Sequence, residues 1–420
     1  MNAPSTVEPT PVEAVRLADP YPFYARLVAE RPFAFDEALG AWVAADAAAV
    51  RAVLGAGALR VRPVAEPVPA GIAGTAAGEV FGELVRMTDG AAAVRLKGVV
   101  AQALARADLG RAAALAARFT REALAGGGEV PYEELMFGVP ARVVAALSGL
   151  ADGADREAAA AIGDFVRCIP ASAAEDDHRA AASAAARLRE LLGPPLAAAS
   201  ATDAGSGAGV LPGARTGREG AAPAGAPAPA GGSAYPAGRA NGLLRELVAA
   251  AERTGWEHAG PLLSNAIGFL SQTYDATAGL IGNTLVALSR GAGAPDTGAL
   301  DTGALVREVV RYDAPIQNTR RFAAGAFTHA GSTVEPGQPV LVLLAAANRD
   351  PAVNPDPHTL SPGRVNPTVF TFGAGAHRCP GGELATVLAT AVVDGLRRAG
   401  WSTSATPAYR PLANARIPLL

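Results

Sequence analysis

The segment Phe372-Gly373-Ala374-Gly375-Ala376-His377-Arg378-Cys379-Pro380-Gly381 decides how the rest of the chain is interpreted. It places Cys379, one of only two cysteines, in a glycine-rich loop. The residues from Leu384 to Leu396 then carry apolar side chains at helical spacing. A cysteine just before a helix lies at the positive end of the helix dipole, which stabilises negative charge on sulfur. Glycines let backbone N–H groups approach that sulfur, so the loop suits a thiolate ligand to a haem iron.

The two cysteines lead to different predictions. A lone free cysteine is most often an inert core residue, and this remains the simpler alternative for Cys379 until other motifs are considered. Cys168 lies in the apolar stretch Phe165-Val166-Arg167-Cys168-Ile169, which predicts an inert core position. Two cysteines so far apart do not suggest a disulfide framework, so a reducing cytoplasm is the expected compartment.

Composition bounds the class of protein. The chain has 420 residues, of which 50% are hydrophobic, and a formal net charge of −3. That length can bury one large core, and near neutrality does not indicate a nucleic-acid partner. The first residues contain neither a basic segment nor an apolar run, and later apolar stretches are interrupted before they reach membrane-spanning length. We therefore expect a soluble, cytoplasmic protein without membrane contact.

The apolar periodicity predicts a chain rich in helices with a few short strands. Helices are expected at Pro22–Glu30, Asp46–Leu54, Asp89–Ala103 and Pro261–Arg290, and over most of Arg111–Ala199. Strands are expected at Phe33–Phe35, Ala41–Val43 and Val340–Ala345, with a hairpin around Val334–Gly337 and a loop over Gly55–Gly78.

The stretch between Leu211 and Leu243 has a different composition. Its only large apolar side chain is Tyr235, and its centre is built from alanine, proline and glycine. Such a segment buries too little apolar surface to offset the entropy lost on ordering. We predict that residues 212–241 form a flexible insertion within a single domain spanning residues 1–420. An inert insertion is favoured over one that contacts a carrier protein or a second copy.

Polar residues interrupt the long helix expected at Pro261–Arg290. The run Ser271-Gln272-Thr273-Tyr274-Asp275-Ala276-Thr277 needs partners or a purpose inside an apolar helix. Capping within the core is the structural alternative. Further on, Glu308 and Arg311 lie three residues apart on one face of a predicted helix, about seventy residues before Cys379.

These motifs together resemble those of the cytochromes P-450. Phe372, Gly375, Cys379 and Gly381 match the Phe-x-x-Gly-x-x-x-Cys-x-Gly haem loop of that family, and Glu308 with Arg311 matches its buried Glu-x-x-Arg pair. The resemblance covers nearly the whole chain. It implies the cytochrome P-450 fold, which is mainly α with a small β lobe, and a pair that locks the scaffold of the haem loop.

The resemblance also implies the cofactor and its contacts. Haem b would take Cys379 as the axial ligand of its iron. The residues that would surround the cofactor are Lys97, Arg321, Phe372, Gly373, His377, Cys379 and Gly381. Lys97, Arg321 and His377 would contact its propionates.

Two departures from the family concern these contacts. Ala93 and Lys97 stand where the family has histidine and arginine. Lysine can neutralise a propionate only as a point charge, without the bidentate fork of arginine. Thr359 and Leu360 replace the arginine and phenylalanine that usually complete the Glu308–Arg311 pair, so the sequence does not identify its third partner.

The distal helix departs furthest from the family. The family motif Ala/Gly-Gly-x-Asp/Glu-Thr supplies an acid and an alcohol that deliver protons during oxygen activation. Aligned on Asp275, this chain keeps the acid but has Ala276 in place of the alcohol. Thr277 is rotated by about 100° around the helix, whereas Thr273 lies one turn earlier on the face of Ala276. We predict catalytic roles around Thr273, Asp275, Ala276 and Thr277, with protons from Thr273, from ordered water or from the substrate.

The expected function is oxygen-dependent monooxygenation of a small specialised metabolite. Electrons would come from a separate ferredoxin and reductase, because the chain contains no flavin or ferredoxin module. Two alternatives remain open. One is a haem-thiolate enzyme that does not activate oxygen and instead catalyses nitrene transfer, dehydration or rearrangement. The other is a non-catalytic haem protein.

Overall fold

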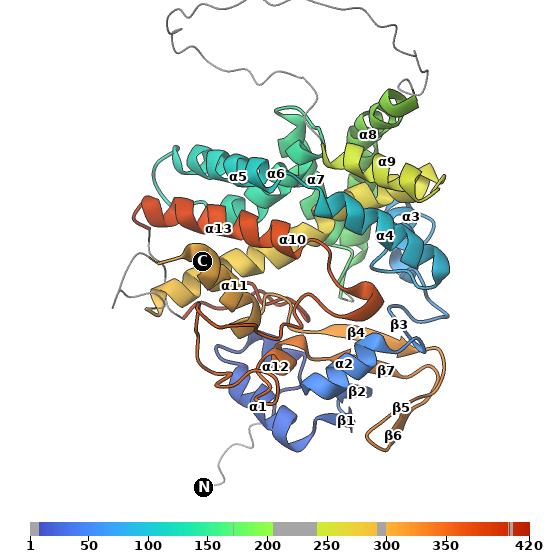
Figure 1. The fold of residues 1–420 in the computed structure, drawn as a ribbon, viewed down its shortest axis with the longest axis vertical. Coiled ribbons are helices and arrows are strands. Elements are labelled where there is room, and N and C mark those ends of the chain that lie inside the picture. Colours follow the sequence, from blue (N-terminus) through green and yellow to red (C-terminus); the bar gives the residue numbers. More distant parts are fainter. Residues whose placement is uncertain (1–7, 171, 205–241, 292–299, 402, 404–405) are drawn as a thin grey trace, which may run out of the picture.

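The structure is a computed structural model that describes residues 8–170, 172–204, 242–291, 300–401, 403 and 406–420. Helices from the middle of the chain and helix α13 form one large part of the molecule, and the β-strands with α1, α2 and α12 form a smaller part (Figure 1). The predicted insertion at residues 212–241 lies outside the described residues.

Most of the described chain is helical. The α-helices are α1 (Tyr21–Glu30), α2 (Ala47–Gly55), α3 (Ala76–Glu83), α4 (Ala91–Ala105), α5 (Leu109–Leu124), α6 (Val139–Leu147), α7 (Ala154–Val166), α8 (Glu175–Ala204), α9 (Leu243–Arg253), α10 (Ala259–Ser289), α11 (Thr302–Tyr312), α12 (Leu344–Asn348) and α13 (Gly382–Arg398). Short 3₁₀ turns are η1 (Glu13–Arg16), η2 (Ala70–Ile72) and η4 (Gly375–His377), and η3 (Glu134–Gly138) is a π-helical turn.

The β lobe contains a five-stranded sheet in the order β1-β2-β7-β4-β3. Its strands are β1 (Phe33–Asp36), β2 (Ala41–Ala44), β3 (Leu59–Arg60), β4 (Thr319–Ala323) and β7 (Pro339–Val342). Only β2 and β7 run parallel, with Trp42 opposite Val340. A separate two-stranded ribbon pairs β5 (Phe327–His329) with β6 (Ser332–Val334). The sheet therefore joins strands from the N-terminal region to strands that precede the cysteine loop.

The structure confirms the predicted helices and the first hairpin, and it corrects the later strands. The turn at Val334–Gly337 is not a hairpin, because β6 pairs back with β5 through Ala330 and Gly331, both at positive φ. The strand predicted at Val340–Ala345 ends at Val342, and α12 begins at Leu344. The predicted loop Gly55–Gly78 contains β3, η2 and the start of α3.

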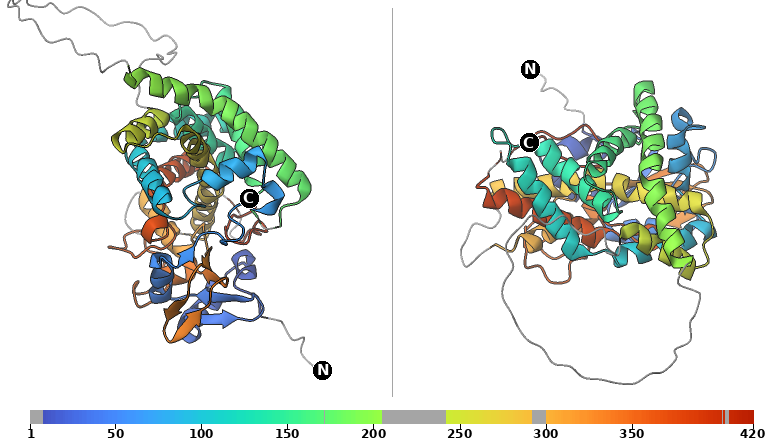
Figure 2. Two further views of the ribbon diagram at one scale, coloured as in Figure 1. Left: turned by 90° about the vertical axis from the view of Figure 1, so that its right-hand side faces the viewer. Right: turned by 90° about the horizontal axis from the view of Figure 1, so that it is seen from above.

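Helix α10 runs through the middle of the helical part, and the further views show other helices on several sides of it (Figure 2). It packs against α3, α6, α11 and α13, among others. Two glycines allow the C-terminal segment to approach it closely. A Cβ on Gly279 would lie 2.9 Å from Arg416 O, and one on Gly282 would lie 2.6 Å from Pro418 Cγ. A larger residue at either position would force the two segments apart.

A buried ion pair joins the two ends of the described chain. Arg416 Nε donates to Asp313 Oδ1 at 2.9 Å, and both side chains are buried. The same guanidinium donates to the backbone carbonyls of Val15, Leu17 and Ala18. All three guanidinium nitrogens are thus paired, which helps a buried ion pair to be tolerated. No chemical role of this C-terminal arginine was visible in the sequence pattern.

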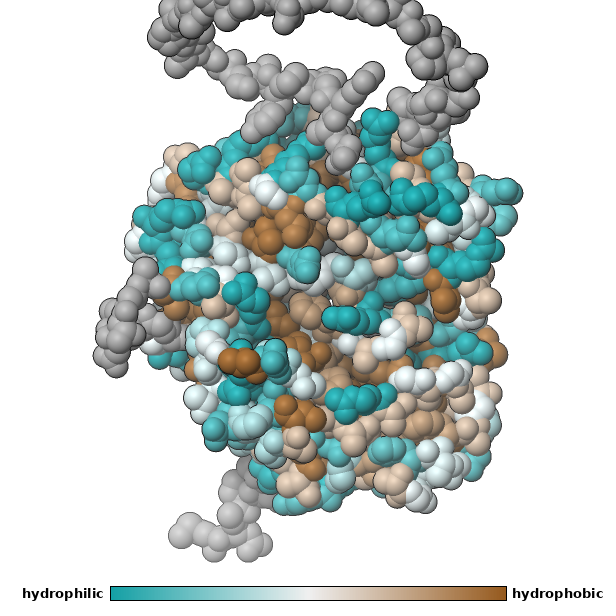
Figure 3. All heavy atoms as spheres, viewed as in Figure 1, coloured by the Kyte–Doolittle hydropathy of each residue, from teal (hydrophilic) through white to brown (hydrophobic). Residues whose placement is uncertain are grey.

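Polar and apolar residues alternate over the face drawn in Figure 3, without a sharply bounded apolar field. The large exposed apolar side chains come from separate parts of the described chain, namely Leu17, Val64, Val94, Val365 and Leu419. Among the described residues, no helix has both the length and the apolar character that crossing a bilayer requires.

Candidate functional site

The cysteine loop is shaped by backbone hydrogen bonds and by two glycines. The N–H of Gly373 donates to Phe370 O at 2.6 Å, and the N–H of Cys379 donates to Phe372 O at 2.7 Å. Gly373 and Gly375 have φ of +67° and +65°, a conformation that favours glycine. A Cβ on Gly375 would also lie 2.8 Å from Leu54 O. The loop therefore needs glycine at this position for both conformation and space.

The two thiols occupy opposite environments. Cys379 is exposed, three residues before α13, and its sulfur makes no hydrogen bond to any described residue. Cys168 is 3% exposed, and burial raises the pKa of its thiol to about 11. This confirms the predicted core position of Cys168. It also leaves Cys379 as the accessible thiol, near the N–H groups of the first turn of α13.

The Glu308–Arg311 pair supports the segment that leads into the loop. Arg311 Nη2 lies 2.6 Å from Glu308 Oε1, and both side chains are buried. Arg311 also donates to the carbonyl oxygens of Asn348 and Pro357. The side chain of Asn348 in turn accepts from the N–H of Phe370 at 2.6 Å. This chain of contacts connects α11 to the start of the cysteine loop, as predicted.

The third partner of the pair is Arg364, which the sequence did not identify. Arg364 Nε donates to Glu308 Oε1 at 3.3 Å, and the backbone N–H of Ser361 donates to the same oxygen at 3.1 Å. Thr359 contributes its backbone carbonyl, which accepts from Arg311 Nη2. The second guanidinium beside Glu308 therefore belongs to Arg364, five positions after Thr359, where the family has its arginine. A motif aligned on side-chain types alone cannot show that shift.

Two cations lie near Cys379 without a fixed partner. Lys97 and Arg86 make no hydrogen bond or ion pair with any described residue, and both are half-buried. Burial lowers the pKa of Lys97, the charge of Arg86 lowers it further, and the sulfur of Cys379 opposes both. Burial also lowers the pKa of Arg86, against the opposing charges of Asp275 and Cys379. Arg86 was not predicted, because no motif surrounds it.

A second charged group surrounds His377. Its Nε2 lies 3.1 Å from Asp89 Oδ1, and the N–H of Val61 donates to Asp89 Oδ2. Burial alone would raise the pKa of Asp89, but these two hydrogen bonds outweigh it and hold the pKa below its ordinary value. Arg321 is 5% exposed, and burial lowers its pKa while Asp89 opposes the shift. Arg321 and His377 are thus brought together through Asp89, a residue the motif comparison did not single out.

On α10 the predicted residues separate into two environments. Gln272, Thr273, Tyr274, Asp275 and Ala276 are half-buried within an otherwise buried stretch of helix. Thr273 Oγ1 donates to Phe269 O at 2.7 Å. Thr277 is fully buried and its hydroxyl has no hydrogen-bond partner among the described residues. Thr273 and Asp275 are therefore both partly accessible, on different sides of the helix, whereas Thr277 is enclosed.

Asp275 is held toward its protonated form. Burial raises its pKa, and the charges of Arg86 and Arg410 reduce that shift without cancelling it. Its carboxyl makes no hydrogen bond or ion pair within the described parts of the chain. A half-buried acid with a raised pKa holds its proton to higher pH than an ordinary aspartate, which suits a proton donor.

These residues fit haem. A haem-thiolate site needs an accessible thiolate for the iron and cations for the two propionates. Cys379 is exposed three residues before α13, and Lys97 is a half-buried cation left unpaired within the described chain. Within the described chain, Arg321 donates through Nη1, to Thr319 Oγ1 and Arg320 O. Strand alternation explains its position, because Arg320 faces solvent and the next side chain faces inward.

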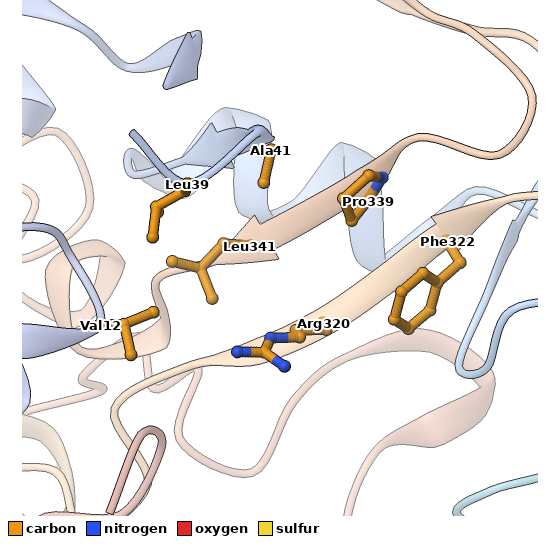
Figure 4. Close-up of a pocket in the computed structure, with 7 residues that line it drawn as sticks. All are labelled: Val12, Leu39, Ala41, Arg320, Phe322, Pro339 and Leu341. Atoms are coloured by element: carbon orange, nitrogen blue, oxygen red, sulfur yellow. The ribbon is translucent and has the colours of Figure 1, made fainter. Parts of the chain in front are cut away.

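A pocket of about 280 Å³ elsewhere in the molecule carries no comparable chemistry. Figure 4 shows its lining, which comes from β2, β4, β7 and the N-terminal region. Those residues are Val12, Leu39, Ala41, Arg320, Phe322, Pro339 and Leu341. None of them is a predicted site residue, and Arg320 is their only charged side chain.

Comparison with known proteins points to one family. A model of the family described as cytochrome P-450 matches residues 302–394, which contain both Glu308 and Cys379. The chain is 39% identical over 134 residues to 6-deoxyerythronolide B hydroxylase of Saccharopolyspora erythraea, covering 30% of this chain and 32% of the relative. It is 32% identical over 148 residues to 20-oxo-5-O-mycaminosyltylactone 23-monooxygenase of Streptomyces fradiae, covering 34% and 35%. These alignments span about a third of the relatives' length.

The fold extends the similarity beyond those segments. The cytochrome P-450 PksS of the Bacillus subtilis 168 bacillaene polyketide synthase superposes with a TM-score of 0.73. The superposition covers 98% of each chain at 16% sequence identity, so it shows the shared fold. The family match lies on the segment that holds the Glu308–Arg311 pair and the cysteine loop, and the fold is shared along nearly the whole length. The chain has the cytochrome P-450 fold, and the segment that holds its cysteine loop matches the model of that family.

Proposed function

We propose that this protein is a haem-thiolate monooxygenase that carries haem b and oxidises a small specialised metabolite. The exposed thiol of Cys379 at the start of α13 carries the proposal. When bound, haem supplies an iron that activates molecular oxygen. In the overall reaction one oxygen atom enters a C–H bond of the substrate and the other leaves as water. Two electrons and two protons are consumed, and the electrons come from a separate ferredoxin and reductase.

The chain's own residues would hold the cofactor and balance its charge. Cys379 would bind the iron. Lys97 on α4, and Arg321 and His377 near Asp89, would face the propionates. Phe372, Gly373 and Gly381 shape the loop. The Phe372 ring packs against Gly382, where an added Cβ would lie 3.2 Å from the ring. Lysine at position 97 gives a point charge, so Arg321 would provide the only bidentate contact of the predicted set.

Proton delivery is assigned to the half-buried stretch 272–276 of α10. Asp275 can hold a proton there, because burial raises its pKa. Thr273 lies one turn before Ala276, and its oxygen can still accept a hydrogen bond while its proton is bound to Phe269 O. We assign Asp275 as the proton donor, with Thr273 and ordered water completing the route to the substrate side. Thr277 is assigned a packing role.

One observation favours a second candidate. Ala276 stands at the usual alcohol position, Thr277 is fully buried, and the hydroxyl proton of Thr273 is bound to Phe269 O, so neither threonine of this stretch is free to donate. A haem-thiolate catalyst of nitrene transfer, dehydration or rearrangement needs no delivery of protons to oxygen. We still favour the monooxygenase, because this chain retains Asp275, the acid of the family's proton-delivery motif.

A spectroscopic experiment tests the proposed cofactor and ligand. The purified protein is reduced, carbon monoxide is added, and the position of the Soret band is recorded. We expect the band of a thiolate-ligated haem, its loss in Cys379→Ala and its retention in Cys168→Ala, the matched control for a buried thiol. A band typical of histidine ligation in fresh, active protein would sink the assignment. Turnover with and without oxygen then separates the two candidate functions.

A further inference from the structure

The segment that joins α3 to α4 is fastened to α10. Asn265 Oδ1 accepts from the N–H of Val85 at 3.0 Å, and Asn265 Nδ2 donates to Glu83 O at 2.9 Å. Ser264 Oγ donates to the carboxylate of Glu83 at 2.6 Å. Two consecutive residues of α10 thus hold the last residue of α3 and the second residue after it. Arg86 follows directly on this anchored backbone.

The next turn of α10 brings the segment into close contact. A Cβ on Gly268 would lie 2.9 Å from Leu84 Cδ2 and 3.0 Å from Gln272 Nε2. Asn265, Gly268 and Gln272 share one face of the helix at helical spacing, and Asp275 is the next residue along that stripe. The backbone before Arg86 is therefore positioned against the face of α10 that carries Asp275.

Arg86 carries its charge near Asp275 and near Cys379. Both groups favour the charged guanidinium, and Arg86 in turn disfavours the charged form of Lys97. Arg86 is half-buried, and its guanidinium forms no hydrogen bond or ion pair with any described residue. Removing a guanidinium from water without giving it partners is costly unless a ligand supplies them.

We propose that Arg86 binds a carboxylate of the substrate on the α10 side of the haem, so that this enzyme selects an organic anion. The inference rests on the proposed haem-thiolate function. Lys97, Arg321 and His377 already suffice for the two propionates, which leaves this guanidinium for another anion. Its planar fork matches a carboxylate in two parallel hydrogen bonds. Gln272, also unpaired among the described side chains, adds a neutral donor on the same helix face.

The test uses iron-binding probes, so that it needs neither the true substrate nor turnover. 4-(Imidazol-1-yl)benzoate and 4-(imidazol-1-yl)benzamide differ only in the charge of the group held away from the imidazole, and 1-phenylimidazole lacks that group. Binding of each is titrated by the shift of the Soret band. The ratio of the benzamide Kd to the benzoate Kd measures the preference for an anion. It is compared among the wild type, Arg86→Gln, Arg86→Lys and the control Arg95→Gln.

We expect Arg86→Gln to lower that ratio by roughly tenfold or more, the size of a lost charge-assisted hydrogen bond. Arg86→Lys should retain part of the preference, because the charge remains without the fork. Arg95 is exposed on α4 and donates to Thr254 O, so Arg95→Gln should leave the ratio unchanged. An unchanged ratio in Arg86→Gln would overturn the inference.

Two further outcomes keep the inference distinct from the proposed function. If 1-phenylimidazole causes no Soret shift in the wild type, the haem-thiolate assignment itself fails, and the inference falls with it. If Arg86→Gln loses haem while Arg95→Gln keeps it, Arg86 holds the cofactor and the substrate assignment is wrong. Haem content per chain, measured before each titration, decides between these outcomes.

Discussion

Arg364 Nε donates to Glu308 Oε1 across 3.3 Å, although the two residues lie 56 positions apart. Together with Arg311, it gives the buried carboxylate two cationic partners. Arg364 also donates to the carbonyl oxygens of Pro355, Asp356 and Thr359, so it fixes the irregular segment that precedes the cysteine loop. Arg364 therefore neutralises the buried Glu308 carboxylate of α11 and also holds the backbone that leads to the cysteine loop.

We expect Arg364→Ala to destabilise the protein and to lower its haem content. A lost hydrogen bond to a charged group costs about 1.5–3 kcal/mol, and the loop would lose its backbone contacts as well. Urea unfolding and haem content per chain measure the two effects. Arg307→Ala is the control, because that side chain is 63% exposed and makes only a long ion pair, 3.8 Å from Asp301 Oδ2. Equal unfolding midpoints for the two variants would contradict the role of Arg364.

Much of this arrangement could be predicted from the sequence, and the exceptions have a physical cause. Glu308 and Arg311 lie on helix α11, and Cys379 lies in the short loop just before α13, so their fixed spacings can be recorded in a linear motif. Arg364 and Arg86 lie on irregular segments, where no periodicity relates sequence position to direction. The backbone before Arg86 is held by Asn265. Its side chain accepts from the N–H of Val85, which lies 180 positions away in the sequence. Long-range contacts of this kind leave no local pattern.

The strand errors have a related cause. Residues 334–337 form the turn that their sequence predicts. The strands on either side, β6 and β7, nevertheless pair with other strands and not with each other. β7 is taken up between β2 and β4, so β6 is left to pair with β5. Turn residues indicate where the chain reverses, and burial of Val340 and Val342 decides which sheet the strand joins.

The two threonines of α10 should differ in their effect on coupling. If oxygen is required for turnover, we expect Thr273→Ala to divert more reductant into products other than the oxidised substrate than Thr277→Ala does. Thr273 is half-buried, as Asp275 is, whereas Thr277 is fully buried. The ratio of product formed to reductant consumed measures the difference. Uncoupling by Thr277→Ala alone would contradict the role assigned to Thr273.

Asp275 should make stability depend on pH in a direction that is unusual for an aspartate. Its pKa is raised in the folded protein, mainly by burial. The folded state then holds the proton more tightly than the unfolded state, so stability falls as pH rises from the ordinary aspartate pKa through the raised one. We expect Asp275→Asn to remove this loss. Its stability advantage in urea should grow from pH 4 to pH 8, and a difference independent of pH would contradict the raised pKa.

Lys97 offers a direct test of propionate anchoring. We expect Lys97→Gln to speed the transfer of haem to apomyoglobin by roughly tenfold, because a charge-assisted contact is lost. Lys97→Arg should slow the transfer below the wild-type rate, since the guanidinium can bind both carboxylate oxygens. Arg95→Gln, on the solvent side of the same helix, should match the wild type. The same rate in all four proteins would show that Lys97 does not contact the cofactor.

The buried pair of Arg416 with Asp313 sets an order of events during synthesis. Asp313 and the carbonyls of Val15, Leu17 and Ala18 leave the ribosome long before Arg416 does. Until then the carboxylate has the Tyr21 hydroxyl but no cation beside it, and the β lobe cannot close around it without a desolvation cost. Chains dominated by such distant contacts fold late. The β lobe should therefore close only after the segment that carries Arg416 has been synthesised.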